Sequence, residues 1–118
     1  MKKKIIHVDN SEFFRKQMHN FLEAEGFEVE SFDNAQEAMF SIGAGSGNMV
    51  IMGLTFQDLG GEDFVVKVLE SFSGPVLLVS SSVDKDKEEQ LLKLGIKAAI
   101  NKSGLWKAAL MPYLSELK

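Results

Sequence analysis

The stretch Asn48-Met-Val-Ile-Met-Gly53 decides the fold of this chain. Four apolar residues in succession are typical of a strand that is buried on both faces, as in a parallel sheet covered by helices. In an open α/β sheet, binding and chemistry take place just beyond the carboxyl ends of the central strands. Gly53 stands at such a strand end, and a glycine has no side chain with which to do chemistry.

Outward from this strand, apolar runs and helical stripes alternate along the whole chain. Strands are predicted at residues 5–8, 27–31, 49–52, 76–79 and 97–101. A stripe with helical spacing follows each of them, with Ser11 and Asp33 as expected N-caps of the first two helices. The connections are too short for anything but parallel strands joined by crossover helices.

The character of each run gives the strand order. The runs at 5–8, 49–52 and 76–79 are continuously apolar and therefore central, whereas 27–31 alternates and 97–101 is weakly apolar, as edge strands are. This pattern predicts one three-layer α/β/α domain over residues 1–118. The expected fold is the flavodoxin-like (βα)5 fold, a five-stranded parallel sheet in the order 2-1-3-4-5 with two helices on one face and three on the other.

Composition narrows the function. The 118 residues carry a net charge of −4 and no cysteine, so a nucleic-acid binder, a disulfide and a thiolate metal site are disfavoured. No apolar run approaches the length of a membrane span, and the amino-terminal apolar stretch is too short for a signal peptide. We therefore expect a cytoplasmic protein that contacts neither membrane nor nucleic acid.

The predicted strand order brings four strand ends to one crevice, and these ends carry Asp9, Gly53, Ser80 and Lys102. Here the sequence resembles the CheY-like receiver domain of two-component response regulators. The matching segments are Ile5-Ile-His-Val-Asp9-Asn10-Ser11, Phe14-Arg15-Lys16, Phe21-Leu22-Glu23-Ala-Glu-Gly26-Phe27, Pro75-Val-Leu-Leu-Val-Ser80 and Ala99-Ile-Asn-Lys102.

The resemblance implies an activity. Receivers accept a phosphoryl group from a histidine kinase on an aspartate at the end of the third strand, with Mg²⁺ held by that aspartate and an acidic pair after the first strand. By resemblance, Ser80 and Lys102 would contact the phosphoryl group. Read without the family, Ser80 could instead cap the loop into the next helix, and Lys102 could pair with Asp9.

The chain departs from the family pattern where the chemistry lies. The acidic pair is Asp9-Asn10, and the phospho-accepting aspartate is Gly53. In the following loop, Phe56-Gln-Asp-Leu-Gly-Gly61, only Gly61 matches; the usual proline after the lysine is Ser103, and the aromatic switch residue is Ala99. A carboxylate is needed to form an acyl phosphate, and Mg²⁺ prefers carboxylate oxygens. We therefore expect no catalytic residue, no metal ligand set and at most weak Mg²⁺ binding.

Three functions remain open. The leading hypothesis is a degenerate receiver that acts in signal transduction as a phosphorylation-independent protein-interaction module, possibly as a homodimer, and not as an enzyme. The second is a regulatory module that binds a small anion or metabolite in the crevice through Ser80, Ser81 and Lys102. The third is a receiver phosphorylated on another acidic residue, with Asp58, Glu62 and Asp63 as candidates or, alternatively, as plain solvated charges.

The binding surface is expected around the last helix. Leu110, Leu114 and Leu117 form its inward stripe, which leaves other large side chains on other faces. The predicted interaction face consists of Trp106, Met111 and Tyr113, with Lys87 and Gln90 at its rim, because aromatic residues are favoured at interaction hot spots. The alternative is that Trp106 folds back over the sheet edge beside Ala98 and Ala99.

Overall fold

The computed structural model describes residues 2–54, 58–81 and 83–118, so Phe56, Gln57 and Ser82 of the predicted loops lie outside the described residues. The strands are β1 (Lys4–Val8), β2 (Glu28–Phe32), β3 (Met49–Met52), β4 (Val76–Ser80) and β5 (Ala98–Asn101). The helices are α1 (Glu12–Ala24), α2 (Ala35–Gly43), α3 (Gly61–Ser71), α4 (Lys85–Leu94) and α5 (Trp106–Leu117). Every predicted strand is present, with its ends within one residue of the prediction.

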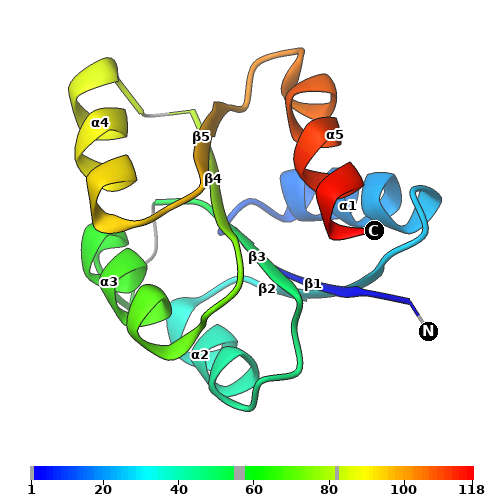
Figure 1. The fold of residues 1–118 in the computed structure, drawn as a ribbon, viewed down its shortest axis with the longest axis horizontal. Coiled ribbons are helices and arrows are strands. Elements are labelled where there is room, and N and C mark those ends of the chain that lie inside the picture. Colours follow the sequence, from blue (N-terminus) through cyan, green and yellow to red (C-terminus); the bar gives the residue numbers. More distant parts are fainter. Residues whose placement is uncertain (1, 55–57, 82) are drawn as a thin grey trace.

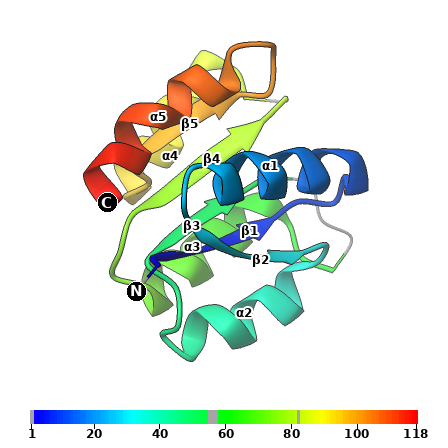
Figure 2. The same ribbon diagram turned by 90° about the vertical axis from the view of Figure 1, so that its right-hand side faces the viewer.

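The strands form one parallel sheet in the order β2-β1-β3-β4-β5. Helices α1 and α5 cover one face of this sheet, and α2, α3 and α4 cover the other (Figures 1 and 2). The predicted flavodoxin-like (βα)5 architecture, its strand order and its division of helices are thus confirmed. Parallel order places the carboxyl ends of all five strands at one edge of the sheet, where the five helices that follow them begin.

The central strand β3 explains why its sequence is apolar throughout. Val50 and Met52 point into the core beneath α2, α3 and α4, whereas Met49 and Ile51 point into the core beneath α1 and α5. All four side chains are buried. Each side chain buried in this way contributes about 1.5–3 kcal/mol relative to exposure, so an uninterrupted apolar run is what this position in the fold requires.

The helix starts follow the capping rules, with one correction. Ser11 caps α1 as predicted, because its hydroxyl accepts a hydrogen bond from the backbone N–H of Phe14. The predicted cap of α2, Asp33, is wrong: Asn34 is the capping residue, and its side chain accepts from the N–H of Glu37 at 2.9 Å. The two neighbours have equally suitable side chains, and only Asn34 combines an extended backbone with that bond.

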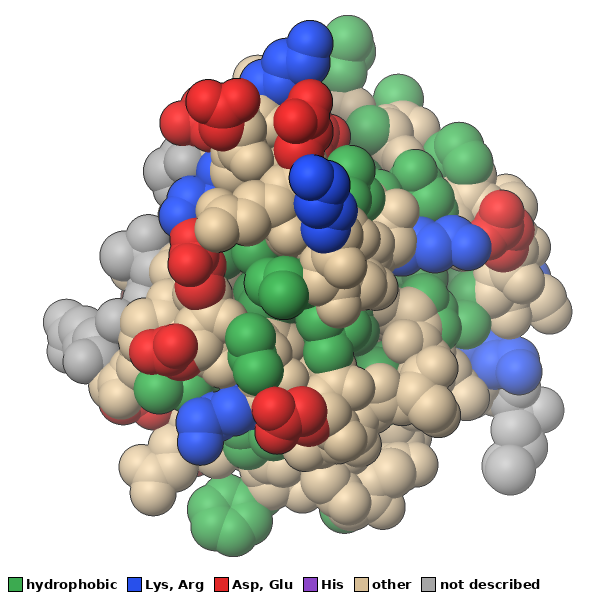
Figure 3. All heavy atoms as spheres, turned by 60° about the vertical axis from the view of Figure 1, so that its left-hand side comes forward, with side chains coloured by type: hydrophobic (Ala, Val, Ile, Leu, Met, Phe, Trp, Pro, Cys, Tyr) green, Lys and Arg blue, Asp and Glu red, His purple; other side chains and the backbone are tan. Residues whose placement is uncertain are grey.

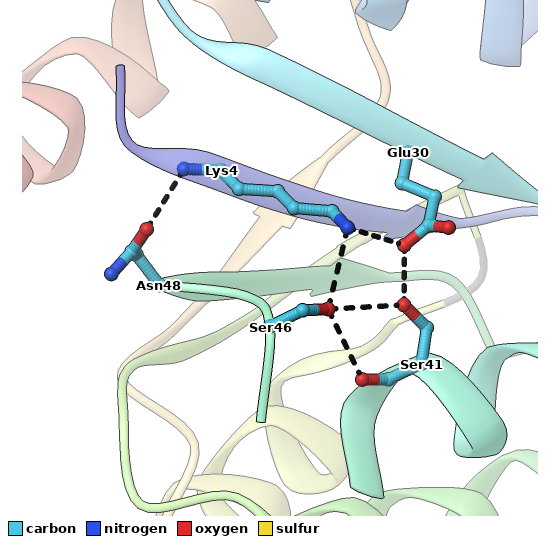
Figure 4. Close-up of polar contacts among 5 residues, drawn as sticks. All are labelled: Lys4, Glu30, Ser41, Ser46 and Asn48. Atoms are coloured by element: carbon cyan, nitrogen blue, oxygen red, sulfur yellow. Dashed lines mark hydrogen bonds and ion pairs between the residues drawn. The ribbon is translucent and has the colours of Figure 1, made fainter. Parts of the chain in front are cut away.

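A polar cluster holds the opposite, amino-terminal edge of the sheet together (Figure 4). The ammonium group of Lys4 contacts Glu30 at 3.0 Å and the Ser46 hydroxyl at 3.3 Å, and the backbone N–H of Lys4 donates to Asn48. The Ser41 hydroxyl donates to Glu30, and this bond, with Lys4, lowers the pKa of the Glu30 carboxyl. The glycine-rich connector at residues 43–47 therefore lies far from the crevice and joins α2 to β3.

The last helix runs through its proline. Pro112 lies inside α5, which continues to Leu117, so the proline does not shorten the helix. The predicted inward stripe is present, with Leu110 and Leu114 fully buried and Leu117 partly buried. Among the described residues, no helix is long and apolar enough to cross a membrane.

Candidate functional site

The carboxyl ends of β1, β3, β4 and β5 meet at a crevice, as the strand order predicts. A cavity of about 160 Å³ lies there, lined by Asp9, Asn10, Gly53, Leu54, Ser80, Ser81 and Lys102. The five predicted crevice residues are therefore brought together from four separate strand ends. Leu54 and Ser81 complete the lining as the residues that follow Gly53 and Ser80.

The centre of the crevice is an ion pair. Lys102 Nζ lies 2.8 Å from Asp9 Oδ2, and the Asp9 side chain is buried. The other carboxylate oxygen of Asp9 accepts a hydrogen bond from the Ser11 backbone N–H at 2.8 Å, and its backbone carbonyl accepts from the Arg15 guanidinium at 2.7 Å. The Lys102 ammonium group also lies 4.4 Å from the centre of the Phe14 ring. Of the two interpretations of Lys102, pairing with Asp9 is the one found.

Gly53 is buried directly beside this ion pair. Its backbone N–H donates to the Val8 carbonyl at 2.9 Å, which fixes the end of β3 against β1. A Cβ atom at position 53 would lie 3.2 Å from Asp9 Oδ2. That separation is tight, so a longer side chain would require Asp9 to move. A carboxylate there would also repel the Asp9 carboxylate.

The residues present do not fit the Mg²⁺ ion that the receiver resemblance implies. Mg²⁺ requires near-octahedral oxygen ligation, usually with carboxylates. The crevice offers one carboxylate, Asp9, which Lys102 already neutralises, and the neighbouring Asn10 supplies an uncharged amide. Among the described residues there is no group of three or more acidic or histidine side chains that could hold a metal ion.

The three alternative acceptors lie outside the crevice lining. Both carboxylate oxygens of Asp58 accept hydrogen bonds at the amino terminus of α2, from Gln36 N at 2.8 Å and Ala35 N at 3.1 Å. These bonds, that from Gln36 foremost, lower the pKa of Asp58. Glu62 pairs with Lys87 of α4, and Asp63 is exposed beside it. Sequence reasoning missed the Asp58 cap, because the contact spans 22 residues.

The retained glycine of the loop, Gly61, has a steric reason. A Cβ atom at position 61 would lie 2.1 Å from the backbone carbonyl oxygen of Leu54. The first turn of α3 therefore packs directly on the chain that leaves β3. Only glycine allows this approach, so Gly61 positions the crevice loop rather than taking part in its chemistry.

His7 lies behind the crevice, two residues before Asp9, near the carboxyl end of β1. It is buried as predicted, but neither ring nitrogen has a hydrogen-bond partner within the described part of the chain, so the expected satisfied histidine is not found. Its ring meets the edge of Phe14 at 5.9 Å between ring centres. Burial lowers the pKa of His7 to about 4; Asp9 opposes this shift, whereas Lys102 and Arg15 add to it. The side chain is therefore uncharged at neutral pH.

The predicted interaction face needs one correction. Trp106 is a core residue that is only 6% exposed, so its expected place at a surface is wrong. Its ring packs against two aromatic side chains of α1, Phe14 at 4.9 Å and Phe21 at 5.5 Å between ring centres. The sequence alternative, in which Trp106 folds back over the sheet, agrees with this burial in part: Ala98 packs against the same core cluster as Trp106, whereas Ala99 packs against the core on the other face of the sheet.

The other residues of that face lie on two sides of the molecule. Met111 and Tyr113 of α5 are half-buried, whereas Gln90 and the partly exposed Lys87 belong to α4, across the sheet edge formed by β5. Figure 3 shows hydrophobic side chains gathered in the middle of the face that carries α3 and α4, with charged side chains around them. The exposed large hydrophobic residues of these two helices are Val66, Leu92 and Leu94. Binding by Lys87, Gln90, Met111 and Tyr113 stays a prediction.

Comparisons with known proteins identify the family of this chain. Residues 5–110 match the model of the response regulator receiver domain. The chain is 31% identical over 87 residues to the protein-glutamate methylesterase/protein-glutamine glutaminase of Bacillus subtilis, which covers 72% of this chain and 24% of that protein. The chain thus spans about a quarter of the length of that relative.

Solved structures show the same fold at low identity. A CheY-like receiver domain protein from Methanospirillum hungatei superposes with a TM-score of 0.89 at 22% identity, covering 99% of this chain and 94% of the other. Chemotaxis protein CheY4 of Vibrio cholerae superposes with a TM-score of 0.85 at 20% identity over the full length of both chains. Because residues 5–110 of the 118 residues match the family model, the chain belongs to the response regulator receiver domain family.

Proposed function

We propose that this receiver domain acts in a two-component pathway of the cytoplasm as a protein-interaction module that works without phosphorylation. The observation that carries the proposal is Gly53 at the end of β3, beside an ion pair between Asp9 and Lys102. Glycine offers no carboxylate for an acyl phosphate. The lysine that receivers would turn toward a phosphoryl group here forms an ion pair with Asp9.

The surroundings support the same conclusion. Asp58 is committed to the amino terminus of α2 and Glu62 to Lys87, so neither carboxylate lies at the crevice. With one neutralised carboxylate and no second one, the crevice has little attraction for Mg²⁺. We expect the output of the domain to depend on its surface, with a signalling protein or a second copy of the chain as partner and no nucleic acid bound.

The esterase and glutaminase activities named for the Bacillus relative are not part of this proposal. That protein is about four times as long as the matched segment, since the chain covers 24% of it. Receiver domains are in general signalling modules rather than enzymes. We therefore propose a non-enzymatic role for the residues in hand.

The test is incubation with a small phosphodonor and Mg²⁺, followed by mass spectrometry of the intact protein. No phosphorylated species should form, and self-association measured by sedimentation should be the same with and without the phosphodonor. A stable singly phosphorylated protein would overturn the proposal. Peptide mapping would then show whether Asp58, Glu62 or Asp63 accepts the group.

A further inference from the structure

A largely apolar groove lies between α2 and α3, on the face of the sheet opposite α1 and α5. Its volume is about 460 Å³, and the apolar residues of its walls are Ala35, Met39, Phe40 and Leu59. An apolar cavity of about 150 Å³ is large enough to hold benzene. The groove therefore has room for an aromatic side chain.

Phe40 presents such a side chain on the same surface. It lines the groove and is nevertheless 76% exposed, because α2 turns Ala35, Ala38 and Ile42 into the core and Phe40 away from it. An exposed phenyl ring beside an apolar groove is typical of a surface that binds a protein. A surface that carries both the ring and the groove can be complementary to itself, as an interface between two copies related by a two-fold axis requires.

The charges beside the groove are complementary in the same sense. Glu37 precedes Phe40 by three residues and so shares its face of α2, and Lys67 of α3 lines the groove. In the part of the chain that the structure describes, neither side chain forms an ion pair. Asp58, the other charged residue of the wall, already accepts hydrogen bonds on both carboxylate oxygens. Glu37 and Lys67 are therefore the two charges that remain to be paired.

We propose that two copies of this chain associate through the α2/α3 groove. Phe40 of each copy enters the groove of the other, and Glu37 of each copy pairs with Lys67 of the other. The proposal rests on the proposed interaction role and deepens it, since it names the partner and the surface. The groove and the crevice share no lining residue, so this association needs no phosphoryl group.

The first experiment is sedimentation of the full chain over a range of concentrations up to millimolar. A reversible dimer is expected, and Phe40→Ser should weaken it by about thirtyfold or more, as loss of a hot-spot residue does. The matched control is Phe13→Ser, which removes a ring that is 73% exposed on α1, across the sheet. This control should dimerise as the unmodified chain does. A chain that stays monomeric, or a dimer that Phe40→Ser leaves unchanged, would overturn the proposal.

Charge reversal tests the pairing between copies. Glu37→Lys and Lys67→Glu each bring like charges together at both contacts, so each variant alone should dimerise weakly. Mixed together, the two variants restore opposite charges at both contacts, and the heterodimer should exceed both homodimers in native mass spectrometry. Lys97→Glu changes the net charge as Lys67→Glu does, but its lysine pairs with Glu116, so it should leave the dimer unchanged. A mixture without excess heterodimer would overturn the proposed pairing and with it the interface.

The outcomes also separate this proposal from the proposed function. A monomeric chain that is not phosphorylated would overturn the interface and leave the interaction role with a different protein as partner. A chain that dimerises through Phe40 and is phosphorylated would overturn the proposed function and leave the interface. Circular dichroism checks the folding of every variant; if Glu37→Lys does not fold, Phe40→Ser and its control decide the question.

Discussion

Lys102 and Asp9 stand 93 positions apart in the sequence, and in the fold Lys102 Nζ lies 2.8 Å from Asp9 Oδ2. The Asp9 side chain is 2% exposed and that of Lys102 is 22% exposed, so the carboxylate depends on this one ammonium group much more than the ammonium group depends on it. The pair joins the end of β1 to the end of β5.

Replacing Lys102 should lower the free energy of unfolding, and a second substitution at Asp9 should restore much of it. Lys102→Met leaves the Asp9 charge buried without its partner, and breaking a buried ion pair costs about 3–5 kcal/mol. The combination with Asp9→Asn should recover much of this loss, because no buried charge remains. Urea denaturation at pH 7 gives the free energies of unfolding. The control, Lys97→Met, breaks an exposed pair and should cost less than about 1 kcal/mol; equal losses for the two lysines would contradict the account.

Restoring one carboxylate should not restore a receiver. Gly53→Asp brings a second carboxylate against Asp9 and Lys102, but Asn10 still lacks the charge that a magnesium site needs. Little phosphorylation is expected for the single variant after treatment with a phosphodonor and Mg²⁺. The double variant with Asn10→Asp should be phosphorylated more, as measured by intact mass. Full phosphorylation of Gly53→Asp alone would show that our account of the metal site is wrong.

The buried histidine should make the protein less stable in mild acid. The pKa of His7 falls from 6.5 in the unfolded chain to about 4 in the fold, so the unfolded chain binds a proton first. The contribution of neutral His7 is fully present above pH 6.5 and is lost as the pH falls toward 4. Between pH 7 and pH 5 the free energy of unfolding should drop by about 2 kcal/mol.

The control for this prediction is a variant without the titrating group. His7→Leu places an apolar side chain of similar size in β1. Urea denaturation of this variant should give nearly the same free energy of unfolding at pH 7 and pH 5. His19, which is partly exposed and pairs with Glu23, is present in both the unmodified chain and His7→Leu. It therefore does not account for a difference between the two proteins. An equal acid loss in His7→Leu would assign the effect to other groups.

The glycine at the start of α3 should not tolerate a methyl group. In Gly61→Ala the Cβ would lie 2.1 Å from the Leu54 carbonyl oxygen, so the backbone must move. Overpacking of this kind costs about 1–3 kcal/mol, and more when backbone atoms are involved. Gly60→Ala is the matched control, because its Cβ would meet only the Asp63 carboxylate at 3.7 Å. Thermal denaturation of the two variants should separate them clearly; equal melting temperatures would contradict the close approach.

Trp106 should behave as core. Trp106→Ala empties a site between two aromatic rings of α1, and such truncations cost about 3–5 kcal/mol. Tyr113→Ala, on the same helix but half-buried, should cost less. If Trp106→Ala left the stability unchanged and abolished self-association, the surface role predicted from the sequence would be restored.

The fold could be predicted from the sequence because the strands are short and become less apolar from the centre of the sheet to its edges. The continuous runs at 49–52 and 76–79 belong to strands flanked on both sides, and the alternating run at 27–31 belongs to an edge. The carboxyl ends of parallel strands lie at the same edge of the sheet, so the position of the crevice could be predicted from the strand order alone.

What the sequence could not supply were contacts between distant side chains. Trp106 could be assigned to either side of its helix until the aromatic rings of α1 were placed beside it. The Asp58 carboxylate had no local partner to suggest its role, since the hydrogen bonds that it accepts come from Ala35 and Gln36 at the start of α2. The choice between Asp33 and Asn34 as cap depended on backbone angles that both residue types adopt equally well.

The position of the single tryptophan gives the protein a built-in optical reporter. Trp106 and Lys102 both lie against the Phe14 ring. The centre of the Trp106 indole is 4.9 Å from the centre of this ring, and the Lys102 ammonium nitrogen is 4.4 Å from it. Any event that draws Lys102 away from Asp9 also changes the electric field and the packing around Phe14. We therefore expect the fluorescence of this one native tryptophan to change with the state of the crevice, so that no label has to be attached to follow it.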